Sequence, residues 1–301
     1  MLARLQSFIT LGLLVTAVLW IGLCSRAGLY AWALLGAAVL LTGHAVFLAL
    51  EFALMTWSNR SDTAPQATLW QLTSAWWAEA LSAPLVFCFR QPFRSHIWPD
   101  HLPTPVSGRH GVLLVHGFFC NRGIWNPWLQ RLYADAVPFL AVNLEPVLGS
   151  IDDYVEAIEH GVSALERATG RPPVVVAHSM GGLAVRRWCV EPGNLDRIRH
   201  VVTIGTPHHG TVLARWAISS NGRQMQRGSH WLSALCTREA KHSPQRAARF
   251  TCFYGHCDNI VFPASTAMMI GADNRHLAAV AHVHMCAREE PYRELQRLLA
   301  D

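Results

Sequence analysis

Two long uncharged stretches open the chain. Residues 5–25 contain no charged side chain, and residues 27–50 form a second such stretch after Arg26. About 20 apolar residues are enough for an α-helix to span a bilayer, so each stretch is long enough to cross one. The short link around Arg26 predicts a tight hairpin of two membrane helices within residues 1–55.

A cleaved signal peptide and a helical pair buried in a soluble domain are the alternatives to this hairpin. No A-x-A-like cleavage site precedes Cys24, Leu23 fits a lipoprotein signal poorly, and the second stretch would still remain as an anchor. We therefore expect attachment to a membrane. One arginine precedes the first span and three follow the second, so the positive-inside rule favours the cytoplasmic side for both ends of the chain.

Residues 56–107 form a connector that is rich in tryptophan and proline. Within it, the segment 69–81 has the pattern of an amphipathic helix. Such a helix either lies at the level of the lipid headgroups or packs on the domain that follows.

Short apolar runs alternate with amphipathic segments from residue 108 to the end of the chain. This alternation, with strands that are almost entirely valine and leucine, is typical of a parallel sheet covered by helices on both faces. The expected class is α/β, with a doubly wound sheet. Strands are predicted at 111–115, 139–144, 174–177, 201–204, 250–254 and 277–283, and helices at 125–134, 151–169, 182–190 and 291–299.

Charge and cysteine content further limit the classes of function that the chain could have. The net charge of +5 comes from 24 scattered arginines and one lysine, Lys241. Nucleic-acid binding is disfavoured because it usually needs a basic stripe or face. The eight cysteines are interpreted mostly as reduced core residues, with one disulfide among the later ones left open.

The segment Ala177-His178-Ser179-Met180-Gly181-Gly182 lies between a predicted strand and a predicted helix. A serine in this context occupies a nucleophile elbow, a strained turn that exposes its hydroxyl group above the sheet edge. Small residues two before and two after the serine let strand and helix approach each other. Ala177 stands where the G-x-S-x-G pattern has glycine, but alanine still permits the turn.

Two further motifs occur in the same order as in a known family. Val115-His116-Gly117-Phe118 ends the first strand of this region, and Gly205-Thr206-Pro207-His208-His209-Gly210-Thr211 follows a later one. With the elbow, these motifs resemble the α/β-hydrolase superfamily, specifically its bacterial lipase and esterase branch, over residues 108–301. The resemblance implies a serine hydrolase that cleaves carboxylic esters without a cofactor. The two apolar stretches at the start of the chain are expected to anchor it in a bacterial inner membrane.

The resemblance also assigns roles to single residues. The backbone N–H groups of Phe118 and Met180 are the expected oxyanion donors, and His116 is expected to brace the loop. The family's chain order of Ser, acid and His makes Asp258 the acid, with Asp273 as the second choice. For the base, loop placement after the predicted last strand favours His284 over His282.

An insertion at 211–249 occupies the place where the family carries its lid. Its apolar residues are candidates for an acyl pocket, although the packing of two short helices explains many of them equally well. These candidates are Trp216, Ile218, Met225, Trp231 and Leu235.

No metal or cofactor is expected. The late His/Cys-rich zone lacks the spacing of a zinc site, and His208 and His209 are interpreted as loop residues. The expected partners are a hydrophobic ester or lipid substrate and the membrane itself. Two other functions remain open: an acyltransferase that uses the same three residues, and a catalytically silent membrane scaffold.

Overall fold

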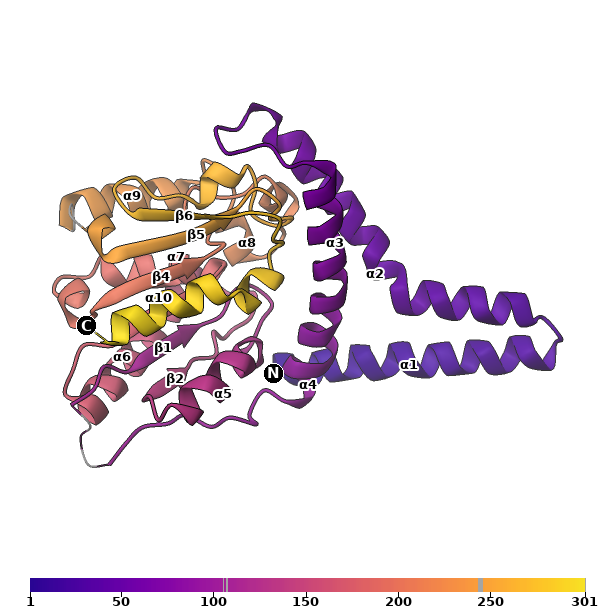
Figure 1. The fold of residues 1–301 in the computed structure, drawn as a ribbon, viewed down its shortest axis with the longest axis horizontal. Helices are drawn as coiled ribbons and strands as arrows, with labels where there is room; N and C mark the ends of the chain where they lie inside the picture. The colour runs from indigo at the N-terminus through magenta and orange to yellow at the C-terminus, as the bar shows by residue number, and fades with distance from the viewer. Residues whose placement is uncertain (105, 107, 243–245, 301) are drawn as a thin grey trace.

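The computed structural model describes residues 1–104, 106, 108–242 and 246–300. Figure 1 shows two long helices, α1 (Leu2–Arg26) and α2 (Tyr30–Ser58), that extend side by side from an α/β body. They form the hairpin expected from the sequence. Gly28 turns the chain between them at φ +74°, a backbone conformation that glycine adopts without steric cost.

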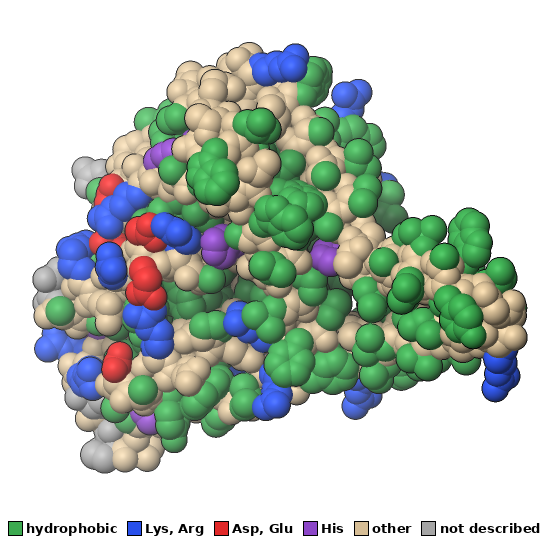
Figure 2. Space-filling view, turned by 45° about the vertical axis from the view of Figure 1, so that its right-hand side comes forward, with side chains coloured by type: hydrophobic (Ala, Val, Ile, Leu, Met, Phe, Trp, Pro, Cys, Tyr) green, Lys and Arg blue, Asp and Glu red, His purple; other side chains and the backbone are tan. Residues whose placement is uncertain are grey.

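The hairpin leaves most of its large apolar side chains on the surface. Phe8 is 76% exposed and Leu34 is 75% exposed, and Figure 2 shows apolar side chains over the hairpin, with the acidic ones on the body. An exposed apolar surface of this size marks a membrane or protein contact. Three helical stretches are long and apolar enough to cross a membrane, which is compatible with membrane anchoring. They are Leu2–Arg26, Tyr30–Ser61 and Leu69–Phe93.

The third of these stretches begins with α3 (Leu69–Pro84), which contains the helix predicted at 69–81. Thr68 caps it, because its hydroxyl group accepts a hydrogen bond from the backbone N–H of Gln71 and the Gln71 side chain accepts one from the N–H of Thr68. One face of α3 buries Glu79 against the body, while Trp70 on the opposite face is 79% exposed. A π-helical turn at Leu85–Arg90 and α4 (Gln91–Phe93) continue it.

The body is built on six parallel strands in the order β2-β1-β3-β4-β5-β6. Its apolar strands are buried on both faces, as a parallel sheet requires, which confirms the predicted α/β class. Two helices pack on each face (Figure 1), α5 (Asn126–Ala134) and α10 (Glu289–Ala300) on one and α6 (Val155–Thr169) and α7 (Met180–Cys189) on the other. The strands are β1 (Val112–Val115), β2 (Phe139–Ala141), β3 (Val174–His178), β4 (His200–Ile204), β5 (Phe250–Gly255) and β6 (Asp273–Leu277).

The position of the last strand differs from the prediction. The strand was expected at 277–283, but β6 ends where that segment begins. β6 is an edge strand with mostly polar residues, so it carries no apolar run that would reveal it. The apolar segment after it is a loop whose Val280 and Ala281 are fully buried.

The segment between β4 and β5 carries α8 (Ser220–Gln224) and α9 (His230–His242). A buried ion pair ties α9 to α7: the guanidinium of Arg186 donates to both carboxylate oxygens of Glu239, at 2.9 and 2.8 Å. The same guanidinium donates to the carbonyl of His208, so it also fixes the loop after β4.

Candidate active site

Ser179 lies at the sharp turn between β3 and α7. Its backbone has φ +54° and ψ −130°, a strained conformation for a residue other than glycine. Gly181 makes the turn possible, because a Cβ atom at this position would lie 2.5 Å from the carbonyl oxygen of His116. Ser179 thus has the conformation of a nucleophile elbow, at the carboxyl edge of the sheet.

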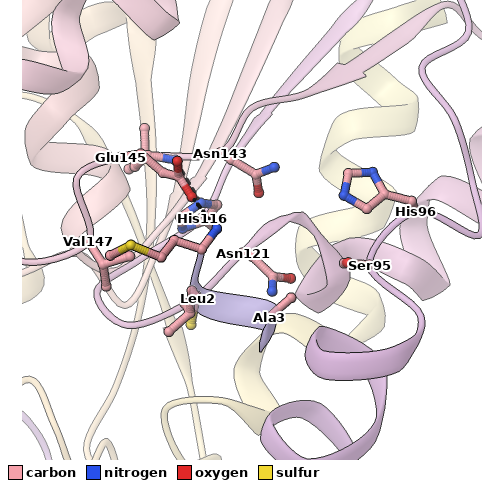
Figure 3. Close-up of a pocket in the computed structure, with 12 residues that line it drawn as sticks. Leu2, Ala3, Ser95, His96, His116, Asn121, Asn143, Glu145 and Val147 are labelled. Atoms are coloured by element: carbon pink, nitrogen blue, oxygen red, sulfur yellow. Dashed lines mark hydrogen bonds and ion pairs between the residues drawn. The ribbon is translucent and has the colours of Figure 1, made fainter. Parts of the chain in front are cut away.

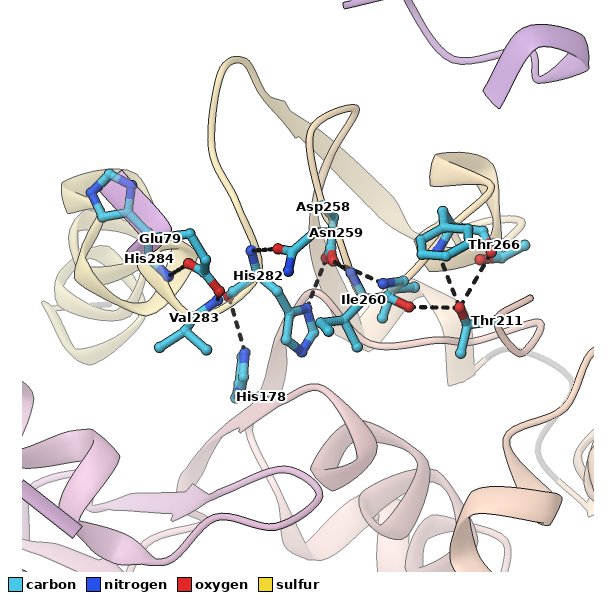
Figure 4. A network of polar contacts seen from close by, with 12 residues as sticks. Glu79, His178, Thr211, Asp258, Asn259, Ile260, Thr266, His282, Val283 and His284 are labelled. Atoms are coloured by element: carbon cyan, nitrogen blue, oxygen red, sulfur yellow. Dashed lines mark hydrogen bonds and ion pairs between the residues drawn. The ribbon is translucent and has the colours of Figure 1, made fainter. Parts of the chain in front are cut away.

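Asp258 follows β5 and contacts His282 from the buried loop after β6 (Figure 4). The Nδ1 atom of His282 lies 2.9 Å from Oδ2 of Asp258. The other carboxylate oxygen accepts hydrogen bonds from the backbone N–H groups of Ile260 and Val261, at 2.9 and 2.8 Å. These contacts orient the carboxylate toward the imidazole.

The structure corrects the preference for His284 as the partner of the acid. The backbone N–H of His284 donates to Glu79, and Figure 4 shows its ring pointing away from Asp258. The strand was expected to end near residue 283, whereas it ends at Leu277, so His282 already lies well inside the following loop. Asp273, the second choice for the acid, begins β6 and pairs with Arg275 on the surface.

The environment of His282 suits a base. Burial lowers the pKa of its imidazole, but the charge and hydrogen bond of Asp258 outweigh this effect and place the pKa above its ordinary value. With Nδ1 donating to the carboxylate, Nε2 of the neutral ring is the acceptor. Ser179 and His282 line the same cavity, which measures about 540 Å³.

His178, the residue before Ser179, supports the histidine loop. Its Nε2 lies 3.3 Å from the carbonyl oxygen of His282, and the two rings are 4.6 Å apart. Burial and the neighbouring His282 lower the pKa of His178 well below its ordinary value, so the ring is neutral and donates to that carbonyl. The motif around the elbow contained this histidine, but its spacing gave no indication of this role.

Two carboxylates from the N-terminal helices also reach the site and were not anticipated. Glu79 accepts hydrogen bonds from the backbone N–H groups of Val283 and His284, each at 2.9 Å. Glu51 of α2 accepts from the amide of Asn259, at 2.7 Å, and the Asn259 oxygen accepts from the N–H of His282. One sequence signal was available: an ionisable residue in an apolar helix is a candidate for a functional role.

The loop after β1 lies against Ser179. A Cβ atom on Gly117 would be 2.7 Å from the Cβ of Ser179, and the next residue, Phe118, lines the cavity beside the serine. Met180 is the first residue of α7, where backbone N–H groups have no partner within the helix. Both predicted oxyanion donors are therefore close to Ser179: Met180 follows it in the chain, and Phe118 lines the same cavity.

His116 braces this loop, as expected. Its Nε2 accepts a hydrogen bond from the N–H of Leu144, so its Nδ1 carries the proton and donates to the carbonyl of Gly117, both at 2.9 Å. Burial lowers the pKa of His116 to about 4, which keeps the ring neutral. Figure 3 shows this histidine beside a small polar cavity of about 60 Å³ that Ser179 does not line.

A second cavity, of about 230 Å³, also reaches Ser179, from the side of the 211–249 insertion. Two of the expected acyl-pocket residues, Trp216 and Met225, line it. The other three do not: Ile218 is 88% exposed, Leu235 is buried in the core, and the Trp231 indole donates to Asp152. Ser179 therefore lies where two cavities meet.

The eight cysteines are all free thiols. Within the described residues, no group of three or more His, Cys, Asp or Glu side chains is arranged to hold a metal ion. His208 and His209 belong to the loop after β4, where the backbone N–H of His209 donates to the carbonyl of Thr266.

Solved structures share this fold at low sequence identity. The mature lipase BlEst2 of Bacillus licheniformis has a TM-score of 0.56 and 17% identity, over 67% of this chain and 95% of its own. Lipase B of Aspergillus fumigatus has a TM-score of 0.52 and 16% identity, over 67% of this chain and 60% of its own. No curated protein sequence matches the chain.

The sequence pattern of one family covers most of the body. It matches residues 112–299, which include the strained serine, the Asp258–His282 pair and the whole parallel sheet. The protein therefore belongs to the alpha/beta hydrolase family.

Proposed function

We propose that the protein is a serine hydrolase that cleaves carboxylic esters of hydrophobic acids at a membrane. The observation that carries this proposal is the Asp258–His282 hydrogen bond, with His282 and the strained Ser179 lining one apolar cavity. Membership of the alpha/beta hydrolase family supports hydrolysis in general. The structural neighbours named above are lipases, which supports an ester substrate.

In the proposed mechanism, Ser179 attacks the acyl carbonyl while Nε2 of His282 takes the hydroxyl proton. His282 then gives this proton to the leaving alcohol, and Asp258 holds the ring and stabilises its charged form. The backbone N–H groups of Phe118 and Met180 stabilise the negative oxygen of the tetrahedral intermediate. Water, activated by His282, releases the acid from the acyl-enzyme. No cofactor takes part in these steps.

The apolar hairpin favours a membrane location for this chemistry. Because the body is attached to long apolar helices, an ester of a membrane lipid is the substrate class that it would meet at the highest local concentration. The distribution of arginines favours the cytoplasmic side of a bacterial inner membrane.

Two other functions use the same features. An acyltransferase would pass the acyl group from Ser179 to an alcohol other than water. A silent scaffold would keep the fold without turnover, but the intact hydrogen bond between Asp258 and His282 favours an enzyme.

Detergent-solubilised full-length protein treated with a fluorophosphonate tests the proposal. We expect one phosphonyl group on the peptide that contains Ser179, found by mass spectrometry, and hydrolysis of p-nitrophenyl esters that labelling abolishes. Labelling without hydrolysis, but with transfer to added alcohols, would favour an acyltransferase. A folded protein that neither labels nor hydrolyses would leave the scaffold.

A further inference from the structure

Residues from the N-terminal helices form much of the wall of the 540 Å³ cavity, the larger of the two that reach Ser179. Residues 6–88 supply ten of its 19 lining residues, and the body supplies the other nine. The contributing elements are α1, α2, α3 and the π-helical turn that follows α3. The hairpin is therefore part of the cavity beside Ser179 as well as an attachment to a membrane.

The rim of this cavity is continuous with the exposed surface of the hairpin. Ile9 on α1 and Phe47 on α2 both line the cavity, yet they are 57% and 62% exposed. Their apolar neighbours Phe8 and Val46 are 76% and 66% exposed. An apolar surface thus leads from the outside of the two helices to the serine.

We infer that this cavity binds the hydrocarbon chain of a long-chain acyl group, which a membrane lipid ester inserts between α1 and α2. The inference rests on the proposed function and names its substrate class. A volume of about 540 Å³ lies within the range of about 300–1,000 Å³ that is usual for ligand sites. The smaller cavity on the insertion side then receives the alcohol part of the ester.

A long chain is favoured because the cavity walls are largely apolar. Each buried CH₂ group of a substrate contributes about 0.8 kcal/mol, so a short acyl group would forgo most of the available binding. Most polar residues of the lining belong to the site at Ser179 or are hydrogen-bonded, as Gln6, Glu51 and Glu79 are, and Thr10 adds one hydroxyl group.

Cys88 provides a readout of occupancy that does not depend on turnover. It is a free, half-buried thiol that lines the cavity. We would treat the full-length protein with an ethyl or a hexadecyl phosphonofluoridate, in which the alkyl group on phosphorus takes the place of the acyl chain. Ser179 displaces fluoride from phosphorus, and its proton leaves with the fluoride as hydrogen fluoride.

The phosphonylated proteins are then treated with N-ethylmaleimide and analysed by peptide mass spectrometry. We expect the hexadecyl group to slow modification of Cys88 at least tenfold, and the ethyl group to leave the rate nearly unchanged. Cys236, which is exposed on α9, is the internal control and should react equally in both samples. Equal rates at Cys88 after both treatments would overturn the inference.

A matched pair of substitutions on α3 tests the same cavity through activity. Ala83 lines the cavity, whereas Ala78 on the same helix does not. Ala83→Phe should lower kcat/KM for p-nitrophenyl palmitate at least tenfold and leave that for the butyrate within about twofold; Ala78→Phe should change neither. If Ala83→Phe lost activity equally on both esters, the cavity would not be the binding site of the acyl chain. If the wild-type protein reacted with no ester and no probe, the proposed function itself would be wrong.

A separate observation concerns Glu79, whose two hydrogen bonds hold the residues directly after His282. Glu79 comes from α3, about 200 residues away in the chain, and it is buried. We also propose that Glu79 is a positioning residue that fixes the histidine loop and presents a negative charge to His282. The carboxyl groups of Asp258 and Glu51 also act on His282, and the neutral ring of His178 lies 4.6 Å from the His282 ring.

The test compares Glu79→Gln with Glu79→Asp, using a short-chain ester. The three carboxylates raise the pKa of His282, and the base works only when neutral, so activity falls as the pH drops through this pKa. We expect both variants to lose about ten- to a hundredfold in kcat with a smaller change in KM, because a displacement of about 1 Å costs that much. Only Glu79→Gln removes the charge, so only this variant should move the acid limb of kcat/KM to lower pH.

Glu289→Gln, which alters a carboxylate in an exposed ion pair, is the control and should show wild-type behaviour. An unchanged acid limb in Glu79→Gln would contradict the electrostatic part of this role. Wild-type kcat in both variants would contradict the positioning itself.

Discussion

Ser179→Ala is expected to lower kcat/KM for p-nitrophenyl esters by about four to six orders of magnitude. The substitution removes the nucleophile, and in serine hydrolases the remaining groups cannot replace it. Initial rates with butyrate and octanoate esters, measured at high protein concentration, would quantify the residual activity. The same variant should not react with a fluorophosphonate, because no other hydroxyl group lies at the strained turn.

Ser233→Ala is a suitable control because this serine is exposed on α9, outside both cavities. It should retain wild-type rates and labelling. If Ser179→Ala kept more than about a tenth of the wild-type rate while its thermal unfolding was unchanged, the nucleophile would have to be another group, and the proposed mechanism would be wrong.

The strands and the elbow were predictable because their signals are local. Four or five consecutive apolar residues identify buried parallel strands, and small residues around Ser179 identify the turn. The hairpin was equally clear, since hydropathy over 20 residues needs no tertiary information. Asp258, which contacts His282, was predictable from its position after β5.

The histidine that contacts Asp258 was harder to predict because its loop has the apolar pattern of a strand. Residues 277–283 are apolar except for His282, and five of the seven are buried, as in a central strand. From residue 278 onward they nevertheless form a loop, while the true last strand is mostly polar and lies at the sheet edge. Because of this one error, the strand was expected to end near residue 283 instead of at Leu277. The expected strand end in turn favoured His284 over His282, two residues earlier.

The spacing of residues along the chain does not reveal the long-range contacts of the site. Glu51 and Glu79 meet the loops of Asn259 and His282 across about 200 residues of sequence. Each appears in the sequence only as an isolated charge in an apolar segment. Their partners become visible only when the helices and the body are brought together.

His282→Ala is expected to lower kcat/KM by about four orders of magnitude or more, while His284→Ala should change it less than about threefold. The two residues differ in what they contact. His282 bonds to Asp258 through its ring, whereas His284 contacts Glu79 through its backbone N–H, which alanine retains. Parallel kinetics on the two variants, with thermal unfolding as a check of folding, would separate them.

Asp258→Asn completes this comparison through its pH dependence. The charge of Asp258 holds the pKa of His282 above its ordinary value, and burial alone would lower it. The neutral amide should therefore reduce kcat/KM strongly and move the remaining acid limb to lower pH, because a base with a lower pKa stays neutral in more acidic solution. A large loss in His284→Ala with an unaffected His282→Ala would instead assign the base to His284, and the Asp258–His282 hydrogen bond would then serve only the structure of the loop.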